Sequence, residues 1–111
     1  MGYYTDYEIV IEKHNSAIDV TDDEFLETVA NRLTEISDYE FDEDLTIYGV
    51  KWYDWEEHMK KLSSEFPSVL FIVDGVGEEN GDVWRAYITD GKAQIEQAKI
   101  QFLPFDEKKL K

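Results

Sequence analysis

Carboxylates are the most numerous charged groups in this chain, and most of them gather in one segment. The sequence holds 26 Asp and Glu residues against 11 Lys and Arg residues, which gives a formal net charge of −15. Between Asp19 and Glu57 lie 14 carboxylates and only two cations, and the run from Asp38 to Asp44 holds five acids in seven positions. Concentrated negative charge repels nucleic acid and anionic membranes and attracts basic surfaces. We therefore expect a basic protein surface as the partner, with neither direct nucleic-acid binding nor membrane binding.

Clustered carboxylates can also bind a divalent cation or act as general acids and bases. Ca²⁺ uses several oxygen ligands, but Asp42-Glu43-Asp44 lacks the alternating aspartates and the distal glutamate of an EF-hand loop. Glycoside chemistry needs one defined pair of carboxylates, and nothing in the sequence selects a pair. We predict no dedicated metal site, and a weak cation site near Asp38 to Asp44 stays open.

The other residues suited to catalysis lack the spacing that catalysis needs. The chain has no Cys, which excludes a disulfide framework, a thiol nucleophile and a thiolate metal site. The two histidines, His14 and His58, show no metal-ligand spacing and are predicted to be solvated. No serine lies in a G-x-S-x-G motif, and Ser63 and Ser64 are expected to face solvent near a helix end. We predict a protein that is not an enzyme and that binds no cofactor.

A glycine-rich stretch has the composition of a phosphate loop but not its context. Gly75-Val76-Gly77, followed by Gly81, leads into a strand instead of a helix, and four carboxylates flank it. Those charges would repel a phosphate group. We therefore predict that residues 75–81 form the turn between two strands.

The acidic segment is compatible with two functions. Duplex nucleic acid carries one negative charge per ~1.7 Å of axis, and rows of carboxylates on a rigid fold can imitate that array in a channel lined by Lys and Arg. A charge of −15 exceeds the magnitude of ~2–8 that suffices for the solubility of a small domain. The alternative is a solvated surface that only keeps the protein soluble. The residues predicted to bind the partner are Asp38, Glu40, Asp42, Glu43, Asp44, Glu56 and Glu57.

Aromatic residues form a second candidate surface. Trp and Tyr side chains with an Arg among them are good anchors of protein interfaces. Such residues also pack the seam between a helix and a sheet, and we favour this core role for Trp55 and Trp84 because a Trp buries a large area. The set comprises Trp52, Tyr53, Trp55, Trp84, Arg85 and Tyr87.

Two amphipathic helices are predicted to position these groups. Apolar residues at spacings of three and four predict a helix over about 22–37, with Thr21 and Glu24 as a capping box. A second helix begins after Asp54, with Glu57 in the capping-box position, and a proline ends it.

Strands and turns account for most of the remaining chain. The continuous apolar run from Val69 to Val73 indicates a strand buried on both faces. Asp90-Gly91 predicts a two-residue hairpin, His14-Asn15-Ser16 a turn, and residues 104–111 a flexible tail. The segments predicted to be strands are 7–12, 45–52, 69–73, 82–89 and 92–102, with a short edge strand over 39–41.

The order strand, helix, strand, helix and three strands predicts the fold class. Two helices that each need one covered face can lie on one side of a mainly antiparallel sheet. We predict an α+β two-layer sandwich, a ferredoxin-like variant that ends in a β-hairpin and forms a single domain over residues 1–111. The sequence shows no signal peptide and no membrane-spanning apolar run, so we expect a cytoplasmic protein.

A pattern of aromatic and glycine residues covers a little over a third of the chain. It runs Trp52-Tyr53-x-Trp55-Glu56-Glu57, Leu62-Ser63-x-x-Phe66-Pro67-x-Val69-Leu70-Phe71, Gly77-Glu78-Glu79-x-Gly81-Asp82-x-Trp84-Arg85-x-Tyr87 and Gly91-Lys92. This pattern resembles small acidic proteins of bacteriophages and prophages, whose roles are generally unassigned. The resemblance implies an inhibitor of host defence, such as an anti-CRISPR or anti-restriction protein that mimics nucleic acid in the host cytoplasm. The residues themselves leave a second function open, a structural or interaction domain whose acidity serves only solubility and which forms a homodimer through an exposed strand edge or through the strand from Trp84 to Tyr87.

Overall fold

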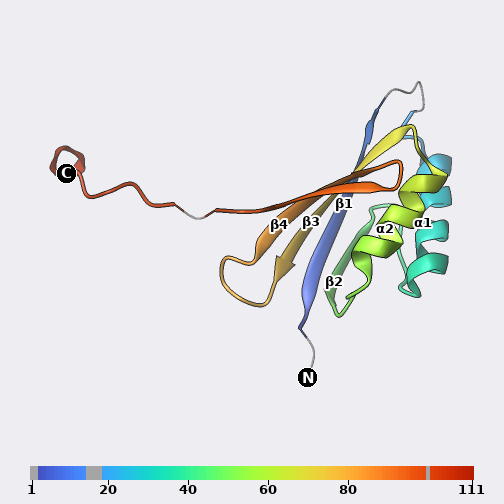
Figure 1. The fold of residues 1–111 in the computed structure, drawn as a ribbon, viewed down its shortest axis with the longest axis horizontal. Coiled ribbons are helices and arrows are strands. Elements are labelled where there is room, and N and C mark those ends of the chain that lie inside the picture. Colours follow the sequence, from blue (N-terminus) through green and yellow to red (C-terminus); the bar gives the residue numbers. More distant parts are fainter. Residues whose placement is uncertain (1–2, 15–18, 100) are drawn as a thin grey trace.

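The computed structural model describes residues 3–14, 19–99 and 101–111, and it consists of five antiparallel strands with two helices on one face (Figure 1). This arrangement confirms the predicted α+β two-layer fold and the predicted order of elements. The elements are β1 (Thr5–Lys13), α1 (Asp23–Ser37), β2 (Thr46–Val50), α2 (Trp55–Glu65), β3 (Val69–Gly77), β4 (Val83–Thr89), β5 (Lys92–Gln97) and a 3-10 turn (Glu107–Lys109).

The strands lie in the order β2-β1-β3-β4-β5, and every neighbouring pair is antiparallel. Because β2 and β3 both run antiparallel to β1, they run parallel to each other, and α2 crosses over β1 to connect them. This split β-α-β unit is the feature shared with ferredoxin-like folds. The predicted hairpin between β4 and β5 is confirmed, with Asp90 and Gly91 both at positive φ.

The core lies between the helices and one face of the sheet. Alternate residues of β1 are buried, which confirms the predicted two-residue periodicity. Strands β3 and β4 also bury alternate side chains in the core. The helices add residues at spacings of three and four from their inner faces. The fully buried side chains include Val29, Leu33, Met59, Leu62, Val69, Phe71, Val73 and Ile88.

The N-cap of the first helix lies one residue after the predicted one. Asp22, not Thr21, is the N-cap, and its carboxylate accepts a hydrogen bond of 3.0 Å from the backbone N–H of Phe25. The Thr21 hydroxyl instead donates a hydrogen bond of 2.6 Å to the carboxylate of Asp19, two residues before it. The second predicted cap is also wrong in detail, since Asp54 flanks α2 but its side chain makes no capping hydrogen bond.

The third strand is longer than predicted, because Gly75 and Gly77 continue it instead of forming a turn. The glycines are needed where side chains from neighbouring segments lie against the strand. A Cβ at Gly75 would overlap the indole ring of Trp84, and one at Gly77 would overlap the Asp82 carboxylate and the Tyr3 hydroxyl. The turn is therefore confined to residues 78–82.

One face of the sheet lies opposite the helices, and we call it the open face. Leu70 and Ile72 of β3 point to this face and are only partly buried, so the prediction of a strand buried on both faces is wrong. Val10, which pairs with Ile72, is exposed on the same face, and so are Val76 and its partner Val83 further along the sheet. The physical reason is that both helices pack on the other face.

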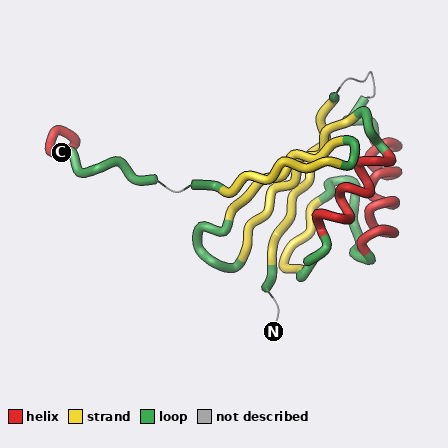
Figure 2. The backbone as a smooth tube through the Cα atoms, viewed as in Figure 1, coloured by secondary structure: helices red, strands yellow, loops and turns green. Residues whose placement is uncertain are grey.

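Three further predictions need correction. Residues 39–41 form no edge strand, since Tyr39 and Phe41 turn inward to the core instead of pairing with a strand. Strand β5 ends at Gln97, and the following segment runs away from the sheet as an exposed tail that ends in the short 3-10 turn (Figure 2). Ser63 is fully buried because its hydroxyl accepts a hydrogen bond from the backbone N–H of Gly91, at the tip of the last hairpin. Asn15, Ser16 and Ile100 lie outside the described residues.

Candidate functional site

The predicted partner-binding acids lie on a connection that the fold holds in place, residues 38–45, which we call the acidic loop. Phe41 and Leu45 are only 6% and 2% exposed, and Tyr39 is half-buried, so these three side chains anchor the loop to the core. Every acid between them is exposed. The exposed acids are Asp38, Glu40, Asp42, Glu43 and Asp44. Alternation of apolar and acidic residues thus sends all five carboxylates outward.

Backbone hydrogen bonds connect the acidic loop to the end of α1. Asp38 adopts a left-handed conformation, with φ of 66°, and its N–H donates to the carbonyl of Thr34 at 3.0 Å. The N–H of Phe41 donates to the hydroxyl of the same Thr34 at 3.0 Å, and the N–H of Leu45 closes a turn onto the carbonyl of Asp42 at 3.0 Å. The first of these bonds pairs a carbonyl in the last turn of the helix, and the other two fix the loop that follows. The carboxylates are therefore presented on a defined backbone.

A hollow of about 420 Å³ separates the acidic loop from the outer face of α1. Asp42, Glu43 and Asp44 line it from the loop, and Glu27 and Asn31 line it from the helix. The structure thus brings three of the predicted residues together with Glu27, an α1 carboxylate outside the predicted set. Asp38 and Glu40 do not line this hollow, although both are exposed on the same loop.

The two remaining predicted residues, Glu56 and Glu57, lie in the first turn of α2. Glu57 is exposed, whereas Glu56 forms an ion pair with Lys60 one turn later, with the Nζ and Oε2 atoms 2.9 Å apart. Trp52 connects this turn to the acidic loop, since its ring centroid lies 5.4 Å from that of Phe41. Both acids lie outside the hollow that contains Asp42 to Asp44.

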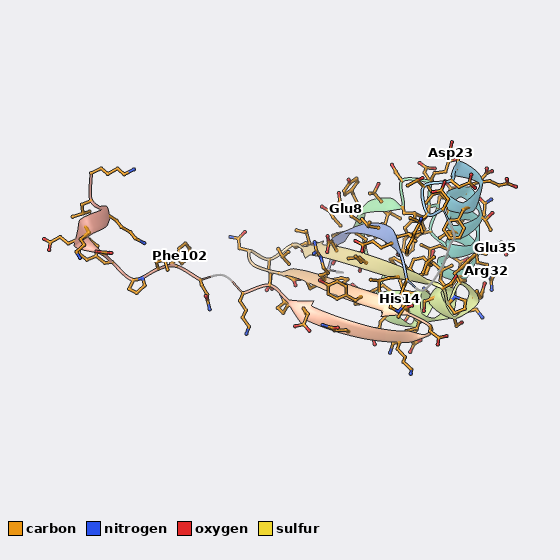
Figure 3. The ribbon with its side chains drawn as sticks, turned by 90° about the horizontal axis from the view of Figure 1, so that it is seen from above. Glu8, His14, Asp23, Arg32, Glu35 and Phe102 are labelled. Carbon is orange, nitrogen blue, oxygen red and sulfur yellow. The ribbon has the colours of Figure 1, made fainter. Side chains whose placement is uncertain are left out.

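Arg32 is occupied by carboxylates of both helices. Its guanidinium donates two hydrogen bonds to Glu65 of α2, at 2.6 and 2.8 Å, and lies 3.6 Å from Glu35 on its own helix. The hydrogen bonds from Arg32 hold the pKa of the Glu65 carboxyl below its ordinary value. Figure 3 shows Arg32 and Glu35 on α1, far from Phe102 on the tail. This cation therefore joins the two helices, and none of the ion pairs among the described residues includes an acid of the acidic loop.

The aromatic set divides between the two faces of the sheet. Trp55 and Trp84 pack together on the helix side, with ring centroids 4.3 Å apart, which agrees with the favoured core role, although both stay partly accessible. Tyr87 and Arg85 lie on the open face, where the Arg85 guanidinium is paired with Asp74 at 2.6 Å. The predicted aromatic residues therefore do not form one continuous surface.

His58 is not the solvated side chain that its position in the sequence suggests. It is half-buried, and its Nδ1 accepts a hydrogen bond of 2.8 Å from the indole N–H of Trp52. The hydrogen bond fixes Trp52 at the start of α2, so this histidine has a positioning role. His14 is exposed, as predicted.

A small aromatic pocket was not predicted from the sequence. It lies where the start of β1, the residues before α2 and the start of β4 meet, and its volume is about 210 Å³. Tyr3 and Asp82 are the lining residues with no earlier signal, because they are far apart in the chain and neither belongs to a motif. Their side chains are joined by a hydrogen bond of 2.6 Å from the Tyr3 hydroxyl to Asp82 Oδ2, which raises the pKa of Tyr3.

Neither known proteins nor metal-ligand geometry identifies a function for this chain. No protein-family model matches it, and no curated protein or solved structure gives a significant match. Over the described ranges, no group of three or more His, Cys, Asp or Glu side chains is arranged to hold a metal ion. Within the same ranges, neither helix combines the length and the apolar composition needed to cross a membrane. The function is therefore inferred from the side chains described above.

Proposed function

We propose that this protein is a non-enzymatic acidic inhibitor that binds a basic surface of a host nucleic-acid-handling protein. The acidic loop is the focus of binding. The observation that carries the proposal is that Tyr39, Phe41 and Leu45 anchor the loop while its five carboxylates stay exposed on a hydrogen-bonded backbone. A charge array held in this way loses little conformational entropy when a partner binds.

The electrostatics favour a partner that normally binds nucleic acid. Carboxylates on one side of a rigid domain attract Lys and Arg side chains that otherwise contact phosphates. Glu27 on α1 extends the acidic surface beyond the loop, and Glu57 on α2 is a further exposed carboxylate. Mimicry of nucleic acid, as in anti-CRISPR or anti-restriction inhibitors, is the form of inhibition that this surface suits.

The test is affinity capture from a bacterial lysate with matched charge variants. Three baits are compared: the wild type, a loop variant and a control variant. The loop variant carries Asp42→Lys, Glu43→Lys and Asp44→Lys. The control carries Glu12→Lys, Glu79→Lys and Glu96→Lys, which change the net charge equally at exposed sites on other elements. The proposal predicts a nucleic-acid-binding protein that is captured by the wild type and the control, lost with the loop variant, and eluted by salt because screening weakens exposed charge pairs. Equal capture by all three baits would remove the acidic loop from the function.

One observation favours the alternative, an interaction domain that forms homodimers. Phe102 and Phe105 on the tail are 91% and 80% exposed, and β1 and β4 leave Val10 and Val83 exposed on the open face. Residues 99–111 hold four Lys against two acids, a net charge of +2, and residues 1–98 carry the remaining −17. A basic, apolar tail and an acidic body with an apolar sheet face are complementary.

We infer that the occupant of the open face in this alternative is the tail of a second copy. A hollow on that face is lined by Val76 and Val83 beside the carboxylates of Asp74 and Glu96. It extends to Ala98, where the tail leaves the sheet. Residues 98–103 contain no Gly, Pro, Asn or Asp, so the chain has no turn-forming residue there to fold back on itself. A tail that does not fold back on its own sheet can still reach the open face of a second copy, so two copies can exchange tails.

The oligomeric state tests the alternative directly. Light scattering after size exclusion is expected to show a dimer that high salt weakens but does not abolish, because salt screens the attraction between tail and body and does not screen apolar burial. Phe102→Ser with Phe105→Ser is expected to give a monomer, whereas Tyr48→Ser, an exposed aromatic change on β2, is expected to leave the dimer intact. A wild-type protein that is monomeric at all concentrations would contradict this second function.

A further inference from the structure

The aromatic rings that line the pocket pack against one another at steep angles. The ring of Tyr7 meets the ring of Trp52 at 66°, with centroids 5.1 Å apart, and the ring of Trp84 at 71°, with centroids 5.9 Å apart. Trp55 stacks on Trp84 and also lines the pocket, and Tyr53, which is 66% exposed, forms its outer rim. Ring surfaces from several directions therefore border one small space.

The pocket is held rigidly by hydrogen bonds from three segments. The Tyr7 hydroxyl donates to the carbonyl of Trp52 at 3.1 Å. The backbone N–H of Tyr3 donates to the hydroxyl of Tyr53 at 2.9 Å, so the chain before β1 is attached to the rim. Gly75 of β3 leaves space in which the ring of Trp84 settles against the sheet. Contacts within the protein therefore hold the walls of the pocket in place.

One carboxylate, Asp82, lies among these rings. It is partly buried, it accepts a hydrogen bond from Tyr3, and none of the ion pairs within the described residues includes it. The positive end of α2 is nearby, but Glu56 and Glu57 in its first turn offset that partial charge. The electrostatic environment therefore favours a cation.

We propose that this pocket binds the head group of an organic cation, such as an ammonium or a guanidinium. The faces of Trp and Tyr rings attract cations through their quadrupoles, most strongly where water is excluded. A volume of about 210 Å³ is below the ~300–1,000 Å³ of pockets that enclose drug-sized ligands, so it suits a head group instead of a whole molecule. The cation comes either from a basic side chain of a protein or from a free ammonium compound.

The pocket is separate from the acidic loop, since Asp42, Glu43 and Asp44 do not line it. Binding of a cation head group therefore does not depend on the function proposed for the loop. The variant that carries lysine at these three positions is expected to bind small cations in the pocket as the wild type does. If the pocket fails to bind cations, the inhibitor proposal is unaffected. If the acidic loop proves to bind no partner, the pocket proposal is likewise unaffected.

Titration of the full chain with small cations tests the proposal. The probes are choline, its uncharged isostere 3,3-dimethylbutan-1-ol, an N-acetyl-lysine methylamide and an N-acetyl-arginine methylamide. Binding is followed by the NMR signals of the indole N–H groups, since Trp52, Trp55 and Trp84 all line the pocket. We expect saturable shifts with at least one cation and none with the uncharged isostere. Tighter binding of the amino-acid amides indicates a protein side chain as the source, and tighter binding of choline indicates a free ammonium compound.

Matched variants separate the pocket from general charge effects. Asp82→Asn removes the charge and keeps the shape, and Tyr53→Leu removes a rim ring; each is expected to weaken binding about five- to thirtyfold. The controls Asp90→Asn, at the far end of β4, and Tyr48→Leu, on β2, are expected to bind as the wild type does. The proposal is overturned if no cation gives a saturable shift, if the uncharged isostere binds equally, or if the controls weaken binding as much as the pocket variants.

Discussion

Replacing Gly75 with alanine gives the most direct test of how the sheet accommodates Trp84. Gly75 lies in a central strand between β1 and β4, and a Cβ there would overlap Cε2 and Cζ2 of the indole. Neither group is free to move, because β3 is hydrogen-bonded on both sides and Trp84 is stacked on Trp55. The added methyl group must therefore be accommodated by strain.

Two opposing effects set the size of the change in the free energy of unfolding. Overpacking a well-filled site costs about 1–3 kcal/mol, and this rigid site belongs at the upper end. Replacing a strand glycine with alanine also stabilises the folded state by about 0.5–1 kcal/mol, because the unfolded chain has less conformational freedom to lose. We expect Gly75→Ala to destabilise the protein by about 2 kcal/mol, which corresponds to a melting temperature lower by about 8 °C for a chain of this size.

Urea denaturation followed by far-ultraviolet circular dichroism measures this change, with the m-value as a check that the unfolded state is the same. The decisive control is the double variant Gly75→Ala with Trp84→Leu, compared with Trp84→Leu alone. If the indole causes the strain, alanine is tolerated in that background, and the coupling energy is about 1–3 kcal/mol. An unchanged or increased stability of Gly75→Ala, or an equal cost with and without the indole, would refute the reasoning.

Three further predictions concern the core and two titrating groups. Leu33→Ala, at a fully buried position of α1, is expected to lower the free energy of unfolding by about 2–5 kcal/mol in urea denaturation. Burial raises the pKa of Tyr7 from 10.0 to about 12. The contribution of its neutral hydroxyl to the free energy of unfolding is therefore complete below pH 10 and is lost as the pH rises towards 12. Stability curves of wild type and Tyr7→Phe should therefore converge over that range. Arg32 lowers the pKa of Glu65, so the contribution of Glu65 is present above the ordinary carboxyl pKa and is lost on acidification. The stability difference between wild type and Glu65→Gln should accordingly shrink as the pH falls in a denaturation series.

The regular elements were predictable because their apolar residues repeat with a clear period. Leu33 and its neighbours on α1 follow a spacing of three and four, and Tyr7, Ile9 and Ile11 alternate along β1. One buried face per element is enough to predict two helices on one side of a sheet. The Asp90-Gly91 hairpin was predictable for a local reason, since its backbone angles demand those residue types.

The predictions that failed depend on contacts between distant residues. Gly75 has the composition of a turn, and only the indole of Trp84 explains why a strand needs a glycine there. Ser63 lies near a helix end, where serines usually face solvent, and only the distant hairpin tip at Gly91 explains its burial. Local rules describe what each residue prefers, whereas the outcome is decided by a partner that the local pattern does not contain.

The candidate sites differ in the same way. Exposure of the acids from Asp38 to Asp44 was predictable, because charged residues next to aromatic ones leave only one way to bury the apolar side chains. The aromatic pocket was not predictable, since Tyr3 and Asp82 come from opposite ends of the chain and meet only after β1 has paired with β3. A sequence motif was therefore available for the first site and absent for the second.

The strand order has a consequence for how the chain folds during synthesis. Strand β1 is made first, but its longest pairing is with β3, and Lys13 and Val69 are separated by 55 residues. The start of β1 also pairs with β2, but at ~5–20 residues per second the residues after Ile9 wait about 3–11 s for their partner in β3. Glu8 and Glu12 alternate with the apolar side chains of β1, and such charges discourage pairing with other nascent chains. We therefore expect the acids of β1 to act before the native state exists, by opposing aggregation of the part of the strand that still lacks its partner.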